Sequence, residues 1–406
     1  MRQNTKNSRV LIYSHDTFGL GHLRRCHTVA QSLVARRKGL SALILSGSPI
    51  IGNFDFKTRV DFVRIPGVIK LRNGEYSSLN LDIDIGEVLE MRASIIQHTA
   101  KVFNPDLFLV DKEPLGLRGE IYDTLQMLKV AGTRCVLGLR DVMDEPELLA
   151  REWRRKNPVP ALRDLYDDVW VYGLPQICDP LAGIDLPQSV RRKITYTGYL
   201  RRHLPNNGDV SAEPHFDEPY VLVTTGGGGD GAHLIDWALR AYETDPEIPY
   251  AALLVLGPFM GPRRREKFRK RVARLARVKA ITFDAHVEYL MANAVGVVAM
   301  GGYNTFCEII SLNKRAIIVP RRSPRMEQYI RASRAQELGL VRMLTDEDNR
   351  DPRRMADALR GLAAQNQPSD IVIPGLLDGL DNIHRLVDGW VSEGPRAAVS
   401  VASQGL

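Results

Sequence analysis

The stretch RVLIYSHDTFGLGHLRRCHTVAQSL, residues 9–33, passes from an apolar run through a glycine loop into a helical pattern. Gly19 and Gly21 permit a tight turn and a close approach of the backbone to a ligand. Apolar residues recur at helical spacing from Leu23 onward, which predicts that a helix begins near His22. Because ligands of open α/β sheets bind at the carboxyl ends of the strands, this loop is a candidate binding site.

The same order of apolar run, glycine loop and helical pattern returns in YVLVTTGGGGDGAHLIDWALRAY, residues 220–242. Four consecutive glycines, residues 226–229, give a backbone that can wrap the oxygens of a phosphate or diphosphate. No Lys-Ser/Thr pair follows them, so the loop is not a P-loop. The residues alone leave a plain structural turn as the alternative.

Apolar, β-rich runs alternate with helical patterns along the chain, which is typical of parallel sheets buried on both faces. These runs are RVLIYS, SALILS, VDFVRI, DLFLVD, RCVLGL, VWVYG and ITYTG, and then YVLVTT, AALLVLG, KAITF, GVVAM and RAIIVP. We therefore predict an α/β protein with two Rossmann-like, doubly wound domains in tandem that face a central cleft. The predicted parts are an N-terminal domain over residues 1–203, a polar linker over 204–218, a C-terminal domain over 219–380, and a helix with a disordered tail over 381–406.

The composition of the chain limits the cellular compartment in which the protein is expected and the partners that it can bind. The chain has 406 residues and a formal net charge of +7, which suits anionic partners such as nucleotides, nucleic acid or a membrane surface. The four cysteines form no CxxC or Cys/His cluster, and no apolar run approaches the roughly 18 residues of a membrane span. We therefore expect a cytoplasmic protein. The basic run over residues 262–279 predicts a solvated helix face, with attraction to an anionic membrane surface as the alternative, and no nucleic-acid motif accompanies it.

A third glycine-containing turn lies in AVGVVAMGGYNTFCEIISLNKRAIIVP, residues 294–320. Gly301 and Gly302 turn the chain after a buried strand, and the Asn-Thr pair that ends at Thr305 is predicted to cap the next helix. Glu308 is then expected in the first turn of that helix, where its carboxylate could accept two hydrogen bonds from a ribose diol. Pairing with the helix dipole is the alternative for this carboxylate.

Three further sets of polar residues have positions that bear on catalysis or metal binding. His22 could act as a general base on a hydroxyl or water, with helix capping as the alternative, and His15 is the fallback base. Asp111 and Glu113 follow the run DLFLV and are candidates to line the cleft. The Asp-x-Asp motif at residues 82–84 is expected to be a solvated segment and not a metal site.

These segments together resemble the GT-B glycosyltransferases. GGYNTFCEIISLNKRAIIVP and MEQYIRASRAQELG are similar to the nucleotide-sugar-binding segment of the peptidoglycan N-acetylglucosaminyltransferases that make lipid II. GLGH resembles the N-terminal TGGH loop of that family, TGGGGDG its second glycine loop, and ITYTGYLRR its strand that ends in TGNPVR. GLGHLRRC also resembles the GxGHxxRC motif of the UDP-sugar hydrolase of pseudaminic acid biosynthesis.

The resemblance implies a UDP-sugar donor and assigns roles to residues of this chain. His22 would deprotonate the acceptor, Glu308 would bind the ribose, and Gln328 would face the donor sugar. The residues implied to contact or shape the nucleotide diphosphate are Gly21, Arg201, Gly227, Gly228, Gly229, Gly301, Gly302 and Thr305. Those implied to lie by the uracil are Phe283, His286 and Val287.

The chain departs from the family pattern at three places. Glu327 stands where the family often has a first Gln, Arg331 replaces an Asn, and the Asn-Pro of TGNPVR is Tyr199-Leu200. These departures leave the identity of the donor sugar open.

The resemblance predicts a glycosyltransferase that moves a sugar from a UDP-sugar to a lipid-linked, cell-envelope or exopolysaccharide acceptor. It further implies inversion at the anomeric carbon, no metal or other cofactor, and action in the cytoplasm or peripherally at the inner face of the cytoplasmic membrane. The alternatives are a UDP-sugar hydrolase of the same fold and a nucleotide-sugar-binding protein without turnover.

Overall fold

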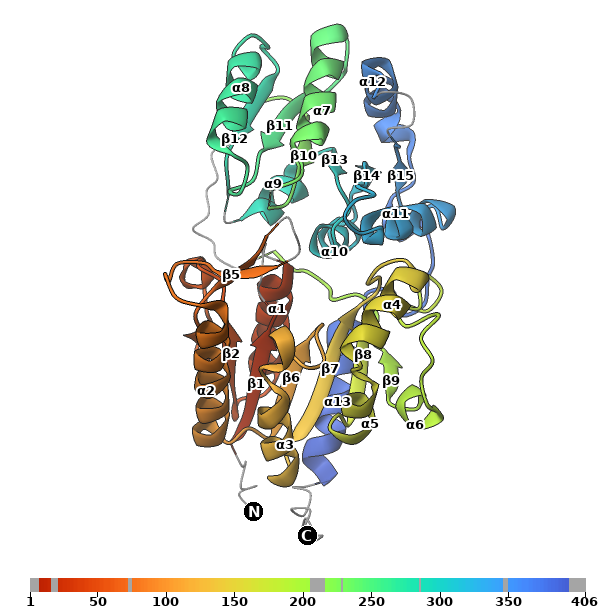
Figure 1. Ribbon diagram of the computed structural model, residues 1–406. Helices are drawn as coiled ribbons and strands as arrows, with labels where there is room; N and C mark the ends of the chain where they lie inside the picture. The colour runs from red at the N-terminus through yellow and green to blue at the C-terminus, as the bar shows by residue number, and fades with distance from the viewer. Residues whose placement is uncertain are drawn as a thin grey trace, which may run out of the picture.

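A computed structural model describes residues 7–15, 21–71, 75–204, 216–227, 229–284, 286–345 and 350–393. It consists of two α/β domains, one above the other, each with a parallel sheet flanked by helices (Figure 1). The prediction of two doubly wound α/β domains is therefore confirmed. Each of the twelve apolar runs forms a strand.

The N-terminal domain contains a seven-stranded sheet in the order β3-β2-β1-β6-β7-β8-β9, and every pairing in it is parallel. Its strands are β1 (Ser8–Ser14), β2 (Leu40–Ser46), β3 (Val60–Arg64), β6 (Leu107–Asp111), β7 (Arg134–Arg140), β8 (Asp168–Tyr172) and β9 (Ile194–Tyr196). Its helices are α1 (Gly21–Arg36), α2 (Ile85–Phe103), α3 (Tyr122–Val130), α4 (Pro146–Lys156), α5 (Val159–Asp164) and α6 (Gln188–Arg191). A small antiparallel hairpin, β4 (Val68–Lys70) and β5 (Tyr76–Ser78), was not predicted.

The C-terminal domain repeats the design with six strands in the order β12-β11-β10-β13-β14-β15. Its strands are β10 (Tyr220–Thr224), β11 (Ala251–Val255), β12 (Val278–Ile281), β13 (Gly296–Ala299), β14 (Arg315–Ile318) and β15 (Arg342–Met343). Its helices are α7 (Ala232–Thr244), α8 (Pro262–Val272), α9 (Val287–Asn293), α10 (Tyr303–Ser311), α11 (Glu327–Glu337) and α12 (Pro352–Arg360). In both sheets the first strand in the sequence, β1 or β10, lies inside the sheet and precedes a glycine loop and a helix.

The last helix, α13 (Gly379–Glu393), crosses back and packs on the N-terminal domain (Figure 1). The Trp390 ring stacks on Trp170 of β8, with 5.5 Å between ring centroids. Asp388 accepts a 2.7 Å hydrogen bond from Nε of Arg37, just beyond α1. The chain therefore passes between the domains twice. The predicted tail beyond residue 393 lies outside the described residues, as do residues 205–215 of the predicted linker.

Two charged motifs of the sequence have structural roles. Asp84 caps α2 by accepting a 2.6 Å hydrogen bond from the Gly86 N–H. On the basic helix α8, Arg271 pairs with Asp236 and Glu243 of α7, and α8 lies at the end of the molecule farthest from the N-terminal domain (Figure 1). Across the described ranges, none of the helices combines the length and apolar character that a membrane crossing requires.

A buried ion pair fastens α2 to the central sheet. Arg92 donates two 2.6 Å hydrogen bonds to Glu120 and a third of the same length to the Pro66 carbonyl, and the Tyr13 hydroxyl of β1 also donates to Glu120. Both charged side chains are 1% exposed. A buried charge without a counter-ion strongly destabilises the fold, so Arg92 and Glu120 each require the other.

We expect Glu120→Gln to lower the free energy of unfolding by about 3–5 kcal/mol, since it leaves the Arg92 charge buried without a counter-ion. Urea denaturation followed by circular dichroism measures this change. Asp164→Asn is the control, because it breaks the exposed Arg163–Asp164 pair and should leave stability unchanged. Equal stability losses in the two variants would contradict the prediction.

Candidate active site

A cavity of about 2010 Å³ lies between the two domains, at the carboxyl ends of β1 and β10. The residues that the resemblance assigned to the site and that the structure describes all line it: Gly21, His22, Arg201, Gly227, Gly229, Phe283, His286, Val287, Gly301, Gly302, Thr305, Glu308 and Gln328. The predictions that Asp111 and Glu113 line the cleft are wrong, since neither is among the lining residues, and His15 is absent from them as well. Gly228 and Gly19 lie outside the described residues. The fold therefore brings together residues from six separate segments of the sequence.

His22 lies in the first turn of α1 and is held by a buried carboxylate. Its Nδ1 contacts Oδ2 of Asp111, the last residue of β6. Arg25, one turn further along α1, donates to both oxygens of Asp111, with Nε–Oδ1 at 2.9 Å and a guanidinium nitrogen at 2.8 Å from Oδ2. With Nδ1 turned to Asp111, the Nε2 atom of His22 is the ring nitrogen that can take a proton from a substrate.

The surroundings keep His22 neutral and Asp111 ionised near pH 7. Burial lowers the pKa of His22 to about 4, since the opposing effect of Asp111 is smaller and Arg25 lowers the pKa further. Burial by itself raises the pKa of Asp111, but Arg25 and His22 together lower it to about 2. A neutral imidazole oriented by a carboxylate is the form that a general base requires.

His15 occupies a different position from His22. It is 4% exposed, is absent from the cavity lining, and lies with its ring centroid 5.8 Å from that of His22. Burial lowers the pKa of His15 well below its ordinary value. His15, the alternative base, therefore does not face the cavity, whereas His22 does.

The glycines of the C-terminal domain shape the opposite wall. Gly226 and Gly301 have φ of +65° and +76°, which residues with side chains rarely adopt. A Cβ atom at Gly301 would lie 2.7 Å from Cγ2 of Ile318, so a larger residue would also clash. Gly302 is the N-cap of α10 and no side chain caps this end, which leaves backbone N–H groups free to bind an anion.

Two local predictions about α10 are wrong. Thr305 and Asn304 lie inside the helix and do not cap it, because α10 begins at Tyr303. Asn304 instead joins the domains: its amide donates to the Gly21 carbonyl at 3.1 Å and its oxygen accepts from Arg202 at 2.8 Å. Glu308 lies in the second turn of α10 and not the first, since it is the sixth residue of the helix.

Glu308 faces the N-terminal domain across the cavity. Its Oε1 lies 2.8 Å from a guanidinium nitrogen of Arg24 on α1, and Arg24 also pairs with Glu288 of α9. Burial raises the pKa of Glu308 to about 7, Arg24 lowers it, and Glu288 raises it. Arg24, which the sequence did not single out, is therefore the cation that partly offsets the effect of burial on this carboxylate.

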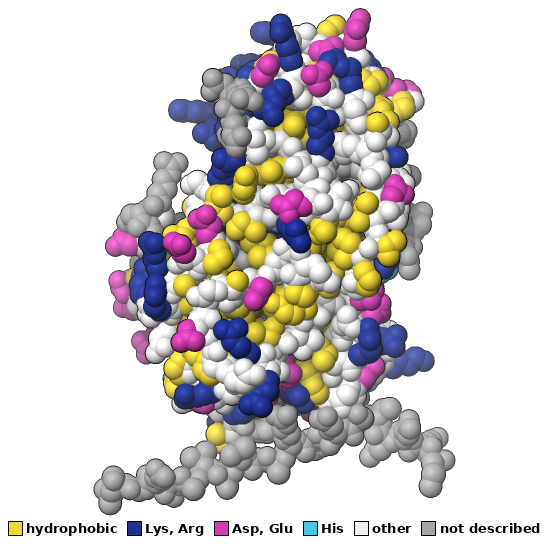
Figure 2. All heavy atoms as spheres, turned by 90° about the vertical axis from the view of Figure 1, so that its right-hand side faces the viewer, with side chains coloured by type: hydrophobic (Ala, Val, Ile, Leu, Met, Phe, Trp, Pro, Cys, Tyr) yellow, Lys and Arg dark blue, Asp and Glu magenta, His cyan; other side chains and the backbone are white. Residues whose placement is uncertain are grey.

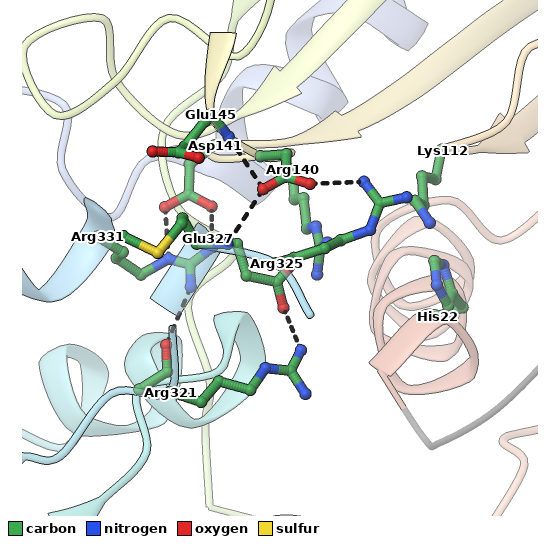
Figure 3. A network of polar contacts seen from close by, with 12 residues as sticks. His22, Lys112, Arg140, Asp141, Glu145, Arg321, Arg325, Glu327 and Arg331 are labelled. Atoms are coloured by element: carbon green, nitrogen blue, oxygen red, sulfur yellow. Dashed lines mark hydrogen bonds and ion pairs between the residues drawn. The ribbon is translucent and has the colours of Figure 1, made fainter. Parts of the chain in front are cut away.

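The start of α11 carries a dense network of charged groups (Figure 3). Glu327 contacts Arg140 of β7 and lies 3.0 Å from Arg321, and Gln328 accepts a 3.2 Å hydrogen bond from the Arg321 N–H. Arg331 donates to both oxygens of Asp141, at 2.7 and 2.6 Å, and to the Gly301 carbonyl at 2.9 Å. Two of these contacts, Arg140–Glu327 and Arg331–Asp141, join the two domains.

Comparison with known proteins identifies the class of enzyme. Residues 221–370 match the model of the glycosyltransferase family 28 C-terminal domain. The whole chain superimposes on solved GT-B glycosyltransferases. This chain has the GT-B fold, and its C-terminal domain is of the family 28 glycosyltransferase type. No curated protein sequence matches it.

Three solved structures illustrate the fold of this glycosyltransferase. The forosaminyltransferase SpnP of spinosyn biosynthesis aligns with a TM-score of 0.61 at 13% identity, over 95% of this chain and 100% of SpnP. MurG of Acinetobacter baumannii aligns with a TM-score of 0.57 at 11% identity, over 94% of this chain and 99% of MurG. UGT2 of Phytolacca americana, complexed with UDP-2-fluoro-glucose and pterostilbene, gives 0.58 at 12% identity, over 94% of each chain. The chain spans the full length of such enzymes, and these likenesses establish its fold.

Proposed function

We propose that this glycosyltransferase moves a sugar from a UDP-sugar to a lipid-linked, cell-envelope or exopolysaccharide acceptor, with inversion at the anomeric carbon. The observation that carries the proposal is the His22–Asp111 pair, which faces the glycine loops of the other domain across the cavity. The acceptor then meets a base from one domain while the donor is held by the other. The enzyme would act in the cytoplasm, peripherally at the inner face of the cytoplasmic membrane.

Residues on both walls of the cavity take part in the proposed reaction. Nε2 of His22 takes the proton from the acceptor hydroxyl, and Asp111 stabilises the imidazolium that forms. The acceptor oxygen attacks the anomeric carbon as the bond to the diphosphate breaks through an oxocarbenium-like state. Because the base and the diphosphate site lie on opposite sides of the sugar, a single displacement inverts the configuration.

The protein itself can balance the charge of the departing diphosphate. The cavity lining includes the uncapped N-terminus of α10, Arg201, and the glycines Gly226, Gly227 and Gly229. Backbone N–H groups and a guanidinium in a preorganised site stabilise developing negative charge, which supports a mechanism without a metal ion. Phe283, His286 and Val287 line the cavity beyond these groups and are proposed to hold the uracil.

Release of the nucleotide from a panel of nucleotide sugars tests the proposal. The panel includes UDP- and dTDP-sugars, because one similar structure, the glycosyltransferase VinC, was solved with dTDP. Nucleotide release that requires a lipid extract supports a transferase with a lipid-linked acceptor. Release without an acceptor would favour the hydrolase, and release abolished by a chelator would contradict the metal-free mechanism.

We expect Glu308→Ala to weaken UDP binding by about 10- to 100-fold, since two hydrogen bonds from the ribose to the carboxyl oxygens are lost. Isothermal titration calorimetry with UDP measures the effect. Glu288→Gln is the matched control, because it removes the other carboxylate of Arg24 but not the proposed ribose contact. Unchanged UDP affinity in Glu308→Ala would rule out the ribose role.

A further inference from the structure

Lys112 sits in an unusual turn directly beside the proposed base. It follows Asp111 at the end of β6, and the Glu113 N–H donates to the Asp111 carbonyl at 2.9 Å, which makes Lys112 the centre of a γ-turn. Its φ is +70°, the rarer and strained form of that turn. Strained residues of this kind cluster at functional sites, where the surrounding structure holds them in place.

The Lys112 side chain is partly buried, and its ammonium has no partner within hydrogen-bond distance among the described residues. Its one ion pair there is with its neighbour Glu113 at 3.6 Å, beyond hydrogen-bond distance, and Glu113 is already bound by Lys156 at 2.7 Å. The Lys112 side chain is 13% exposed. An ammonium largely shielded from solvent and without a hydrogen-bond partner is suited to an anionic ligand. Lys112 is not among the residues that line the cavity, whereas its neighbour Arg140 is.

Two arginines of the network in Figure 3, Arg140 and Arg321, each have a guanidinium nitrogen without a hydrogen-bond partner among the described residues. Arg140 and Arg321 hold the two oxygens of Glu327 between them and both line the cavity. The Nε atoms of both arginines are buried and have no hydrogen-bond partner in the part of the chain that the structure describes. Figure 3 shows Lys112 and His22 on one side of this network and the arginines facing them.

We propose that Lys112, together with Arg140 and Arg321, forms a subsite that binds an anionic group of a substrate, a carboxylate, sulfate or phosphate, next to His22. The inference rests on the proposed function, because it places the anion on the sugar donor or on the acceptor. Glu327 strengthens it, because two arginines pair with this carboxylate and offset the negative charge that would repel an anion. This corner of the cavity thus offers cationic donors where the related family often has an uncharged Gln.

The electrostatics of Lys112 provide a separate readout. Burial lowers the pKa of Lys112 to about 8, and Arg140 and Arg325 lower it while Glu113 and Glu327 raise it. His15 and His22 also face it, and burial keeps both neutral. Because the ammonium is charged below its pKa, affinity for an anion should fall as the pH rises past about 8. Lys112→Arg should remove this dependence, since arginine stays charged.

The first arm of the test asks whether the donor carries the anion. Calorimetry compares UDP-glucuronate with UDP-glucose on the wild-type protein, on Lys112→Met and on the control Lys270→Met, whose lysine is 73% exposed on α8. If the sugar is the source, UDP-glucuronate binds about 10- to 100-fold more tightly than UDP-glucose, and Lys112→Met alone abolishes the preference. UDP affinity should be equal in all three proteins.

The second arm asks whether the acceptor carries the anion. Sulfate, which stays fully charged from pH 6 to 9, is titrated into the protein with and without UDP. The anion belongs to the acceptor if three results are found together. Sulfate binds the UDP-loaded protein, Lys112→Met removes this binding while Lys112→Arg retains it, and the protein shows no preference for UDP-glucuronate. If neither probe depends on Lys112, the subsite does not exist. Failure of UDP to bind would contradict the proposed donor instead, and the sulfate titration without UDP would still decide the subsite.

Discussion

His22→Ala is expected to lower kcat by about 10²- to 10⁴-fold, the usual contribution of a general base, while affinity for the nucleotide changes little. The alanine variant keeps the glycine loops and the N-terminus of α10 that bind the donor, so the loss falls on the chemical step. Steady-state kinetics of nucleotide release measures it. His98→Ala, an exposed histidine on α2, is the control.

The pH dependence gives an independent test of the same role. Because the pKa of His22 lies at about 4, the base is neutral at all higher pH values, and the rate should hold level down to about pH 5. Below that the imidazole protonates and the rate falls. Near-normal turnover in His22→Ala, or an acidic limb near the ordinary histidine value of about 6.5, would show that another group takes the proton.

Asp111→Asn is expected to lower kcat on the order of 10²- to 10⁴-fold, as removal of an orienting carboxylate does in other histidine-dependent enzymes. An amide cannot stabilise the imidazolium as a carboxylate does, and its NH2 group can turn the ring to the wrong tautomer. The substitution also leaves the buried charge of Arg25 without a counter-ion, which should cost about 3–5 kcal/mol of folding free energy.

A double variant separates these two effects of Asp111→Asn. In Asp111→Asn with Arg25→Met, both buried charges are gone, so much of the lost stability should return while the rate stays low. Thermal denaturation and steady-state kinetics on the single and double variants give the comparison. Recovery of the rate together with stability would mean that Asp111 acts only through folding, and the base assignment would then lack its orienting group.

The sequence predicted the walls of the cavity but not the contacts between them. Glycine loops and buried strands have local signals, so every described glycine of the predicted site lines the cavity. The partner of His22 lies 89 residues away, on a strand that pairs with β1 (Tyr13 opposite Val110). Strand order brings the two side chains together, and no local pattern specifies that order. Asp111 was placed at the cleft only because it follows a strand.

Charged residues on helices were the hardest to interpret. Arg24 and Arg25 appear in the sequence as ordinary helix residues, yet one pairs with Glu308 across the cavity and the other holds Asp111. Arg331 appeared to be a departure at the donor site, but it binds Asp141 of the other domain. In each case the role of the arginine depends on a carboxylate from a distant segment of the chain. The sequence alone does not predict such a pairing, because it arises only from the tertiary structure.

The two chain passages between the domains are bonded to each other. The Tyr199 N–H donates to the Leu376 carbonyl at 2.8 Å, and the Gly379 N–H donates to the Tyr199 carbonyl at 3.1 Å. Gly198 lies so close to this second passage that a Cβ atom would come within 2.3 Å of the Gly375 carbonyl oxygen. The two passages therefore form one hydrogen-bonded connection and not two independent linkers. Together with the Arg331–Asp141 and Arg24–Glu308 ion pairs, this connection fixes how the two walls of the cavity face each other.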